Sequence, residues 1–262
     1  MRTVRQVEIL RIDVSSKVAN QMKDCVAQEK PLHVFLNRTL YATIFCTPSK
    51  LKELAVGHLV SEGIVKSIEE IEEVNLKKDV CRVKLTPSID LDKRLSLSKH
   101  FQRVILSACG SKGTYTPPQR LPRIKSNMTI KAETVLNCVN SLNRVAEIYR
   151  KTGGVHAAAI FSSDGTLMAS AEDVGRHNAV DKAIGVMMMR KTDLGKCILT
   201  LTGRMTGDIV MKAARLGMPV VASMAAAIDS GIAVAKKADL TLVGFVRGKR
   251  MNIYNYPERI LA

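Results

Sequence analysis

The sequence predicts an α/β protein in which helices cover both faces of a sheet. In the second half of the chain, apolar segments of strand length alternate with amphipathic segments of about 10 to 15 residues, a rhythm typical of βαβ units and of a largely parallel sheet. Hydrophobic residues make up 46% of the 262 residues, but aromatic residues only 4%, with no Trp. The core must therefore consist of Val, Ile, Leu, Ala and Met, which suits helices packed on a sheet.

The first third of the chain reads as strands with one helix. Alternating apolar and polar residues predict hairpins at residues 32–46 and 74–85. A helix is expected between them, with Thr47 as its N-cap, Pro48 at its first position and Gly63 at its end.

Strands and helices alternate after residue 128. A long amphipathic helix ends at Gly153, and a turn at residues 163–165 joins the two strands that follow. The expected strands are residues 155–161, 166–172, 197–202, 219–223 and 240–246, and the expected helices are residues 129–153, 175–189, 206–217 and 230–238.

The chain is expected to divide into three parts. Residues 1–106 read as a strand-rich N-terminal domain with one helix, and residues 128–262 read as an α/β domain. Residues 107–127 between them contain three prolines among basic residues, so we predict a long mobile loop. A loop of this length commonly has a function.

The composition narrows the functional classes. The net charge is +16, from 40 Lys and Arg against 24 Asp and Glu, which attracts polyanions such as RNA, DNA, an acidic protein or a phosphorylated cofactor. The six cysteines lie far apart without a C-x-x-C pair, so most are expected to be reduced packing residues. No apolar run has the length of a signal peptide or a membrane span, and we therefore expect a cytoplasmic protein.

Ligands of such sheets bind beyond the carboxyl ends of the strands, and three segments are expected there. The first, residues 171–182, places Arg176 and His177 in the first turn of a helix, where free N–H groups favour an anion. Two carboxylates and an amide add further hydrogen-bonding groups. The alternative is an ordinary helix cap in which His177 bonds to Asp181.

The second segment, residues 201–208, places Arg204 beside the N-terminus of another helix, with Thr206 as the expected N-cap. An arginine in this position suits a phosphate or a carboxylate of a ligand. The alternative is an ion pair within the protein.

The third segment is a basic turn after the last expected strand. Arg247, Lys249 and Arg250 surround Gly248, which allows backbone N–H groups to approach a diphosphate closely. Phe245 adds a ring on which a purine can lie. The alternative is a basic turn on an already basic surface.

One histidine resembles a zinc ligand of the cytidine deaminases. His156 begins the segment H-A-A, where the zinc deaminases have H-A-E. Ala158 stands in place of the catalytic Glu, however, and no P-C-x-x-C follows. We therefore expect no zinc site.

Cys109 lies between two small residues in the predicted loop. Lys112, Arg103 and Arg120 are near enough in sequence to lower the pKa of its thiol if the loop folds back. A thiolate so placed could attack a persulfide and carry the transferred sulfur. The alternatives are half of a lost metal site or an ordinary small residue in a loop.

Together these segments resemble the formate dehydrogenase accessory sulfurtransferase family, FdhD. The most specific blocks are EDVGRHNAVDKAIG and TGGVHAA, and further blocks are TPSKLKELAVGHLVSEGIV, SACGSKG, LTLTGRMTGDIVMKAARLGMPVVAS and TLVGFVRGKRMNIYNYPERI. The resemblance extends over nearly the whole chain. It implies a cytidine deaminase-like three-layer α/β domain, with a mixed sheet and helices on both faces, and a smaller strand-rich N-terminal domain.

The same resemblance implies a cytoplasmic sulfurtransferase. It would move persulfide sulfur from a cysteine desulfurase to the molybdenum (or tungsten) bis(molybdopterin guanine dinucleotide) cofactor, a bound client, before insertion into the catalytic subunit of formate dehydrogenase. Cys109 would be the catalytic carrier. The guanine nucleotide ends would bind at Phe245, Val246, Arg247, Gly248, Lys249 and Arg250. The family also implies a homodimer, with no structural zinc, no membrane partner and no nucleic acid.

The sequence departs from the family pattern in the cysteine loop. The family commonly has C-G-x-C-G there, and Lys112 occupies the second cysteine position. Ala227 and Ile228 also replace a proline and a threonine that the family often has. Two hypotheses stay open: Cys109 alone carries sulfur with Lys112 stabilising its anion, or the protein is a cofactor-binding chaperone without sulfur transfer. A nucleic-acid-binding relative of the deaminases is a third, resting on charge and fold alone.

Overall fold

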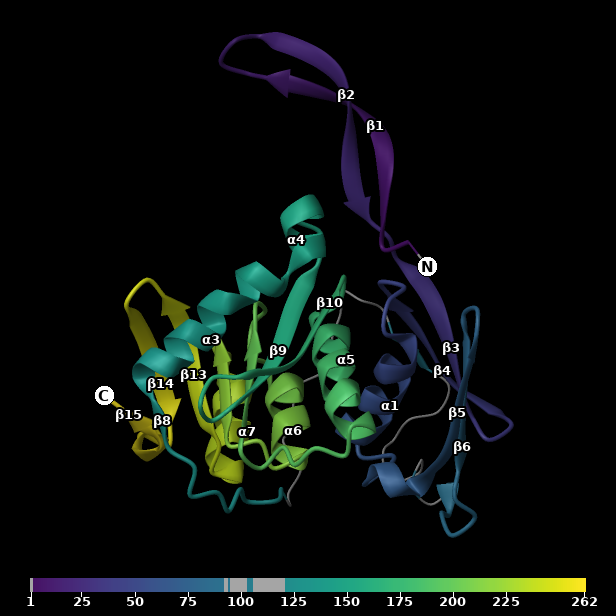
Figure 1. Ribbon diagram of the computed structural model, residues 1–262, viewed down its shortest axis with the longest axis vertical. Coiled ribbons are helices and arrows are strands. Elements are labelled where there is room, and N and C mark those ends of the chain that lie inside the picture. Colours follow the sequence, from purple (N-terminus) through teal and green to yellow (C-terminus); the bar gives the residue numbers. More distant parts are fainter. Residues whose placement is uncertain (1, 92–93, 95–102, 106–120) are drawn as a thin grey trace.

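A computed structural model describes residues 2–91, 94, 103–105 and 121–262 of the protein. The described residues form a mixed α/β structure with a six-stranded sheet, a five-stranded sheet and two two-stranded sheets. Figure 1 shows the six-stranded sheet with its helices as the larger body, the five-stranded sheet beside it, and a two-stranded arm extending away from both. The α/β class expected from the sequence is confirmed.

The six-stranded sheet has the order β10-β9-β11-β12-β13-β14. Its strands are β9 (His156–Ser162), β10 (Leu167–Asp173), β11 (Cys197–Leu201), β12 (Val220–Ser223), β13 (Thr241–Arg247) and β14 (Arg250–Asn255). Strands β11, β12 and β13 pair in parallel, whereas β9, β10 and β14 pair antiparallel with their neighbours. The expectation of a largely parallel sheet is wrong, because short turns join β9 to β10 and β13 to β14 and such turns connect antiparallel strands.

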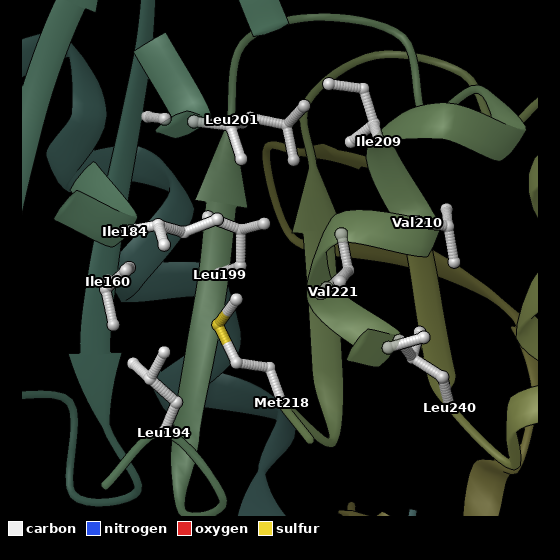
Figure 2. Packing of buried hydrophobic residues seen from close by; sticks show 14 of the residues in the cluster. Ile160, Ile184, Leu194, Leu199, Leu201, Ile209, Val210, Met218, Val221 and Leu240 are labelled. Atoms are coloured by element: carbon white, nitrogen blue, oxygen red, sulfur yellow. The ribbon is translucent and has the colours of Figure 1, made fainter. Parts of the chain in front are cut away.

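Helices cover both faces of this sheet. One face packs on α3, and the other packs on α5, α6 and α7. Their bounds are α3 (Ala132–Val145), α5 (Arg176–Met189), α6 (Gly207–Arg215) and α7 (Asp229–Ala238). Alternation along β11 produces the two faces, since Ile198 lies in the α3 cluster and Leu199 lies in the other cluster with Ile184 of α5. Figure 2 shows Leu199, Ile184, Ile160 and Met218 packed together on that second face.

The expected helix at residues 129–153 is in fact two helices. Helix α3 ends at Val145, and α4 (Glu147–Thr152) begins after Ala146. Ala146 leaves the helical region with φ −87° and ψ 78°, and its side chain is buried. The amphipathic pattern continues across the break, which is why periodicity alone did not predict it.

The N-terminal sheet has the order β5-β6-β3-β4-β7, and helix α1 (Leu51–Ser61) covers one of its faces. Its strands are β3 (Lys30–Leu36), β4 (Thr39–Cys46), β5 (Ile71–Lys77), β6 (Val80–Leu85) and β7 (Arg103–Ile105). Both expected hairpins are confirmed. The expected helix start is wrong, because the residue before α1 is Lys50 in the left-handed conformation, while the Thr47 hydroxyl accepts a hydrogen bond from the backbone N–H of Val174.

Helices α1 and α5 join the two parts of the molecule at a close crossing. A Cβ atom at Gly57 of α1 would overlap the carbonyl oxygen of Asp181, and one at Gly185 of α5 would overlap that of Glu53. Only glycine allows two helix backbones to approach so closely. The contact explains why these two helices contain glycine in their buried interiors.

A two-stranded arm precedes the N-terminal sheet. It consists of β1 (Val4–Asp13) and β2 (Val18–Ala27), which pair antiparallel and extend away from the rest of the molecule (Figure 1). This hairpin was not predicted from the sequence. Leu10, Ile12 and Val14 near its tip are exposed, at 59%, 61% and 85%.

Short elements complete the described structure. They are β8 (Ile130–Lys131), β15 (Ile260–Leu261) and the 3₁₀ turns η1 (Ile68–Glu70) and η2 (Pro257–Arg259). Strands β8 and β15 pair in parallel, which ties the last residues to the start of α3. Among the helices of the described residues, none has the length and apolar character needed to cross a membrane. The division into parts at residues 106 and 127 stays a prediction.

Candidate functional site

The three segments singled out in the sequence meet at the edge where β11, β12 and β13 have their carboxyl ends. Gly203, just after β11, lies so close to Arg176 that a Cβ atom at Gly203 would be 3.1 Å from the Cβ of that arginine. Met205 forms a bridge with Ala227. The N–H of Phe245 in β13 donates to the carbonyl of Ala225 at 3.0 Å. The predicted juxtaposition is therefore present in the fold.

A neutral histidine lies at this edge. The Nδ1 atom of His156 is 3.2 Å from the hydroxyl of Thr202, which also accepts the N–H of Ala157 at 3.1 Å. Burial, followed by the positive charges of Arg176 and Arg204, lowers the pKa of His156. The imidazole is therefore uncharged at neutral pH, and it can donate or accept a hydrogen bond without adding positive charge to the site.

The basic turn between β13 and β14 presents an aromatic ring and several cations. Phe245 has a positive φ of 51°, a conformation that non-glycine residues rarely adopt, and the residue is 37% exposed. The Arg247 guanidinium lies 5.7 Å from the centre of that ring, and its Nε donates to the carbonyl of Met224 at 2.9 Å. Such local strain is typical of binding sites.

The other predicted residues of this turn have different surroundings. Gly248 has a φ of 58°, which makes glycine the favoured residue at this point of the turn. Lys249 and Arg250 are exposed. Val246 is buried, with 1% exposure, in the cluster beneath α3, so only its backbone faces the site.

In the described part of the chain, no Asp or Glu forms an ion pair with Arg204, Arg247, Lys249 or Arg250. The alternative of an internal ion pair for Arg204 therefore has no support among these residues. Clustered cations without counter-charges favour binding of an anion.

The Asp173 carboxylate accepts several hydrogen bonds next to the start of α5. It accepts the N–H of Gly175 at 2.9 Å and the amide of Asn178 at 3.0 Å, and it pairs with Lys182 at 2.6 Å. The N–H of Thr47 donates to the same carboxylate at 3.0 Å. None of these bonds comes from an N–H of the first helical turn, and α5 has no side-chain cap in the described structure, so the Asp173 carboxylate lies beside the helix start without capping it.

A second buried ionic cluster lies behind the site and was not predicted. The Nζ of Lys212 in α6 is 2.9 Å from the carboxylate of Asp181 in α5 and 2.7 Å from that of Glu62 after α1. His58 and Ser61 of α1 reach the same Asp181 carboxylate at 3.1 and 2.7 Å. Although burial opposes it, the two carboxylates raise the pKa of Lys212. The signal in the sequence was the pair of charges, Asp181 and Lys212, on otherwise apolar helix faces.

His177 does not bond to Asp181, so the capping alternative is wrong for this residue. Its Nε2 is a buried atom without a hydrogen-bond partner in the described structure, and so is the hydroxyl of Thr206, which occupies the N-cap position of α6. Burial, followed by the charges of Lys212 and Arg176, lowers the pKa of His177 to about 3. Unpaired buried polar atoms are rare in folded proteins, and a bound water, ion or ligand is one way to satisfy them.

Comparison with known proteins decides the family. Residues 27–261 match the model of the FdhD/NarQ family. This chain belongs to that family. The family inferred from the sequence motifs is confirmed, and the matched range begins at the last residue of β2.

Relatives with a described role resemble the chain over its full length. The sulfur carrier protein FdhD of Saccharolobus solfataricus is 34% identical over 265 residues, covering 98% of each chain. That of Sulfolobus acidocaldarius is 35% identical over 259 residues, again covering 98% of each chain. The crystal structure of a protein described as a formate dehydrogenase accessory protein, from Desulfotalea psychrophila, superposes with a TM-score of 0.79 at 26% identity, covering 99% of this chain and 100% of that one.

The predicted carrier, Cys109, lies outside the described residues, as does Lys112. Among the other cysteines of this FdhD/NarQ family member, Cys25 in β2 is partly exposed, whereas Cys46, Cys81, Cys138 and Cys197 are buried. Burial raises the pKa of Cys46 to about 12 and the pKa of Cys81 and Cys138 to about 11. Such thiols are protonated and unreactive at neutral pH.

The position compared with the zinc deaminases is part of the core in this family member. Ala158, where those enzymes have a catalytic Glu, is fully buried beneath α5. Within residues that the structure describes, no three His, Cys, Asp or Glu side chains gather in a metal-binding arrangement.

Proposed function

We propose that the protein is a sulfurtransferase that takes persulfide sulfur from a cysteine desulfurase and delivers it to the molybdenum (or tungsten) bis(molybdopterin guanine dinucleotide) cofactor for formate dehydrogenase. The observation that carries this proposal is the edge of the larger sheet, where Arg204, Arg247, Lys249 and Arg250 lack carboxylate partners among the described residues beside the exposed ring of Phe245. The names of the relatives, sulfur carrier protein and formate dehydrogenase accessory protein, agree with it.

The proposed ligand is a guanine nucleotide end of this cofactor, which is the cargo. Phe245 offers a partly exposed ring for the base, and Arg247 is held against that ring by its hydrogen bond to Met224. Arg204 and the turn cations provide charge for the phosphates. His156, neutral because of burial and the adjacent arginines, provides a polar group that does not repel a cationic neighbour.

The proposed chemistry takes place at Cys109. Its thiolate attacks the outer sulfur of the desulfurase persulfide, the S–S bond of that persulfide breaks, and the desulfurase cysteine leaves as a thiolate. The sulfane sulfur is thereby transferred to Cys109 without net oxidation or reduction. Lys112 would stabilise the resulting anion.

Persulfide formation tests the carrier role. The protein is incubated with a cysteine desulfurase and cysteine, alkylated, and analysed by mass spectrometry. We expect a persulfide on Cys109 that the variant Cys109→Ala lacks, whereas Cys25→Ala, which removes the partly exposed thiol of β2, retains it. If guanine nucleotide binds but Cys109 never carries a persulfide, the second candidate, a cofactor-binding chaperone without sulfur transfer, replaces the first.

Nucleotide binding tests the ligand role separately. Arg247→Ala should weaken GDP binding about tenfold, since one charge-assisted contact to a phosphate is lost. The matched control is Lys196→Ala, because Lys196 is equally exposed but precedes β11 at the opposite edge of the sheet. Equal affinities of the two variants, measured by calorimetry, would contradict the assignment.

We further propose that the larger domain has the cytidine deaminase-like topology and that the protein is a cytoplasmic homodimer. The arm supports the dimer, because an isolated two-stranded hairpin with exposed apolar residues is marginally stable in water and gains from a partner that covers it. Light scattering of the full chain and of Ile12→Asp tests this. A monomeric mass for the full chain would contradict it.

A further inference from the structure

The N-terminal sheet has one open face. Along β6 the buried residues Cys81, Val83 and Leu85 belong to the cluster under α1, whereas Arg82 and Lys84 alternate with them and are exposed. A groove of about 640 Å³ lies on this side of the sheet. It is lined by Asn37, Arg38, Glu73, Asn75, Lys77, Arg82, Lys84, Leu85 and Pro87.

The groove is strongly cationic. Its lining contains the cations Arg38, Lys77, Arg82 and Lys84 but a single carboxylate, Glu73. Of these four cations only Lys84 has an ion-pair partner among the described residues, Glu72 at 2.8 Å. Arg38, Lys77 and Arg82 therefore line the groove without an ion-pair partner among the described residues.

One of these cations is held in place by an aromatic ring. The Arg82 guanidinium lies 5.1 Å from the centre of the Phe35 ring. A guanidinium stacked in this way keeps the N–H groups at its edge available for a carboxylate, and the stacking reduces the side-chain entropy lost on binding. The groove thus combines a partly ordered carboxylate-binding group with mobile cations around it.

We propose that this groove is a docking surface for an extended, acidic segment of a partner protein. The charge of the groove is complementary to such a segment. The amide of Asn75 can bond to its backbone, as can the amide nitrogen of Asn37, whose oxygen already accepts the N–H of Leu85. A small organic ligand fits less well, because pockets for such ligands are lined mainly by apolar and aromatic side chains, and here the lining is mainly charged and polar.

A nucleic acid also fits less well. Each nucleotide carries a charge, so one of its phosphates would lie against Glu73, whereas a peptide that alternates acidic and neutral residues can place a neutral residue there. Single-stranded nucleic acids bind through stacking of their bases on exposed aromatic rings. Phe35 is the aromatic residue next to the groove, and the Arg82 guanidinium already covers its ring. Carboxylates interspersed with cations are typical of surfaces that bind proteins, because the charge pattern fixes how the two chains align.

Charge also disfavours the undescribed parts of this chain as the occupant. Residues 92–93 and 95–102 contain Asp92 against Lys93 and Lys99, and residues 106–120 contain Lys112 and Arg120 without an acidic residue. These segments have the same sign of charge as the groove. The occupant that complements it is therefore a separate acidic protein.

The test uses a fluorescent peptide of about ten residues that alternates Glu and Val, a length that spans the sheet in extended form. A peptide with Gln in place of Glu is the probe control. The groove variant is Lys77→Glu with Arg82→Glu in the full chain. The protein control is Lys125→Glu with Lys196→Glu, two exposed cations outside the N-terminal sheet, which changes the net charge by the same amount.

We expect the groove variant to bind the acidic peptide at least about tenfold more weakly, since two charge pairs are reversed, while the control pair changes affinity less than about twofold. A milder variant, Lys77→Gln with Arg82→Gln, should show the same direction if charge reversal unfolds the sheet. A peptide carrying a photo-reactive group should cross-link to tryptic fragments that contain β5 or β6.

Three results would overturn the proposal. Equal losses in the groove and control variants would mean that the peptide responds only to net charge. A larger loss of oligouridine binding than of peptide binding in the groove variant would indicate a nucleic-acid surface. A change of oligomeric mass in the groove variant, measured by light scattering without peptide, would indicate that a second copy of this chain is the occupant.

Discussion

Gly57→Ala should destabilise the contact between helices α1 and α5. Gly57 has ordinary helical geometry, and alanine favours a helix over glycine by about 1 kcal/mol, so the substitution by itself would stabilise α1. The added Cβ, however, would lie 2.7 Å from the backbone nitrogen of Gly185 and overlap the carbonyl oxygen of Asp181. Backbone atoms of α5 cannot rotate away from it.

The size of the effect follows from the separation that the helices need. Non-bonded heavy atoms pack at about 3.5 to 4.0 Å, so α1 and α5 must move apart by roughly 1.5 Å to clear the Asp181 carbonyl oxygen. That movement also stretches the bonds that His58 and Ser61 of α1 make to the Asp181 carboxylate, now 3.1 and 2.7 Å. Overpacking costs about 1 to 3 kcal/mol, and the rigid backbone places this site at about 3 kcal/mol. The melting temperature should fall by about 6 to 12 °C.

Urea unfolding and thermal melting of Gly57→Ala, followed by circular dichroism, measure this loss. The matched control is Gly154→Ala, because a Cβ there has its nearest neighbour at 3.4 Å and the backbone φ is not positive. The control should melt within about 2 °C of the parent protein. A Gly57→Ala variant that melts with its control would refute the argument that the backbones touch at this crossing.

Three further predictions concern buried charges and thiols. Lys182→Met should lower the free energy of unfolding by about 3 to 5 kcal/mol in urea titrations, because it leaves the Asp173 carboxylate buried without its cation; a loss below about 1 kcal/mol would mean that the pair is not buried in solution. Burial lowers the pKa of His177 from its usual 6.5 to about 3 in the folded state, so the unfolded chain takes up the proton first as pH falls. The free energy of unfolding should therefore decrease between about pH 6.5 and pH 3, by at most about 1.4 kcal/mol per pH unit. His177→Gln should flatten this slope, and an unchanged slope would argue against a buried neutral imidazole. Alkylation at neutral pH with mass-spectrometric detection should modify Cys25, which is partly exposed, and spare Cys46, whose burial raises the pKa of its thiol to about 12; labelling of both at similar rates would contradict the described burial.

Much of the local structure could be predicted because it depends on neighbours in the chain. Alternation over residues 32–46 and 74–85 predicted the two hairpins, and the strands after residue 155 matched within a few positions. Helix ends were less predictable. Thr47 had the residue type and position of an N-cap, but its groups bond instead to Asp173 and Val174, more than a hundred residues away.

The position of the candidate site could also be predicted from the sequence. Segments at the carboxyl ends of β10, β11 and β13 meet as expected, because strand direction determines the edge on which such ends lie. The role of each residue was less predictable. Val246 faces the core beneath α3, and His177 makes no bond to Asp181 although their spacing along a helix would allow one.

By itself the sequence determined the kinds of element, the positions of the basic turn and of Cys109, and the membership of the FdhD/NarQ family. These depend on periodicity and on residue types at fixed spacing, which local chain geometry translates directly into structure. Only the tertiary structure decided which charges are paired. Lys182 bonds to Asp173 and to the carbonyl of Thr47, and Lys212 joins Asp181 to Glu62, because burial removes water and each ion must take the partner that the packing of α1, α5 and α6 places beside it.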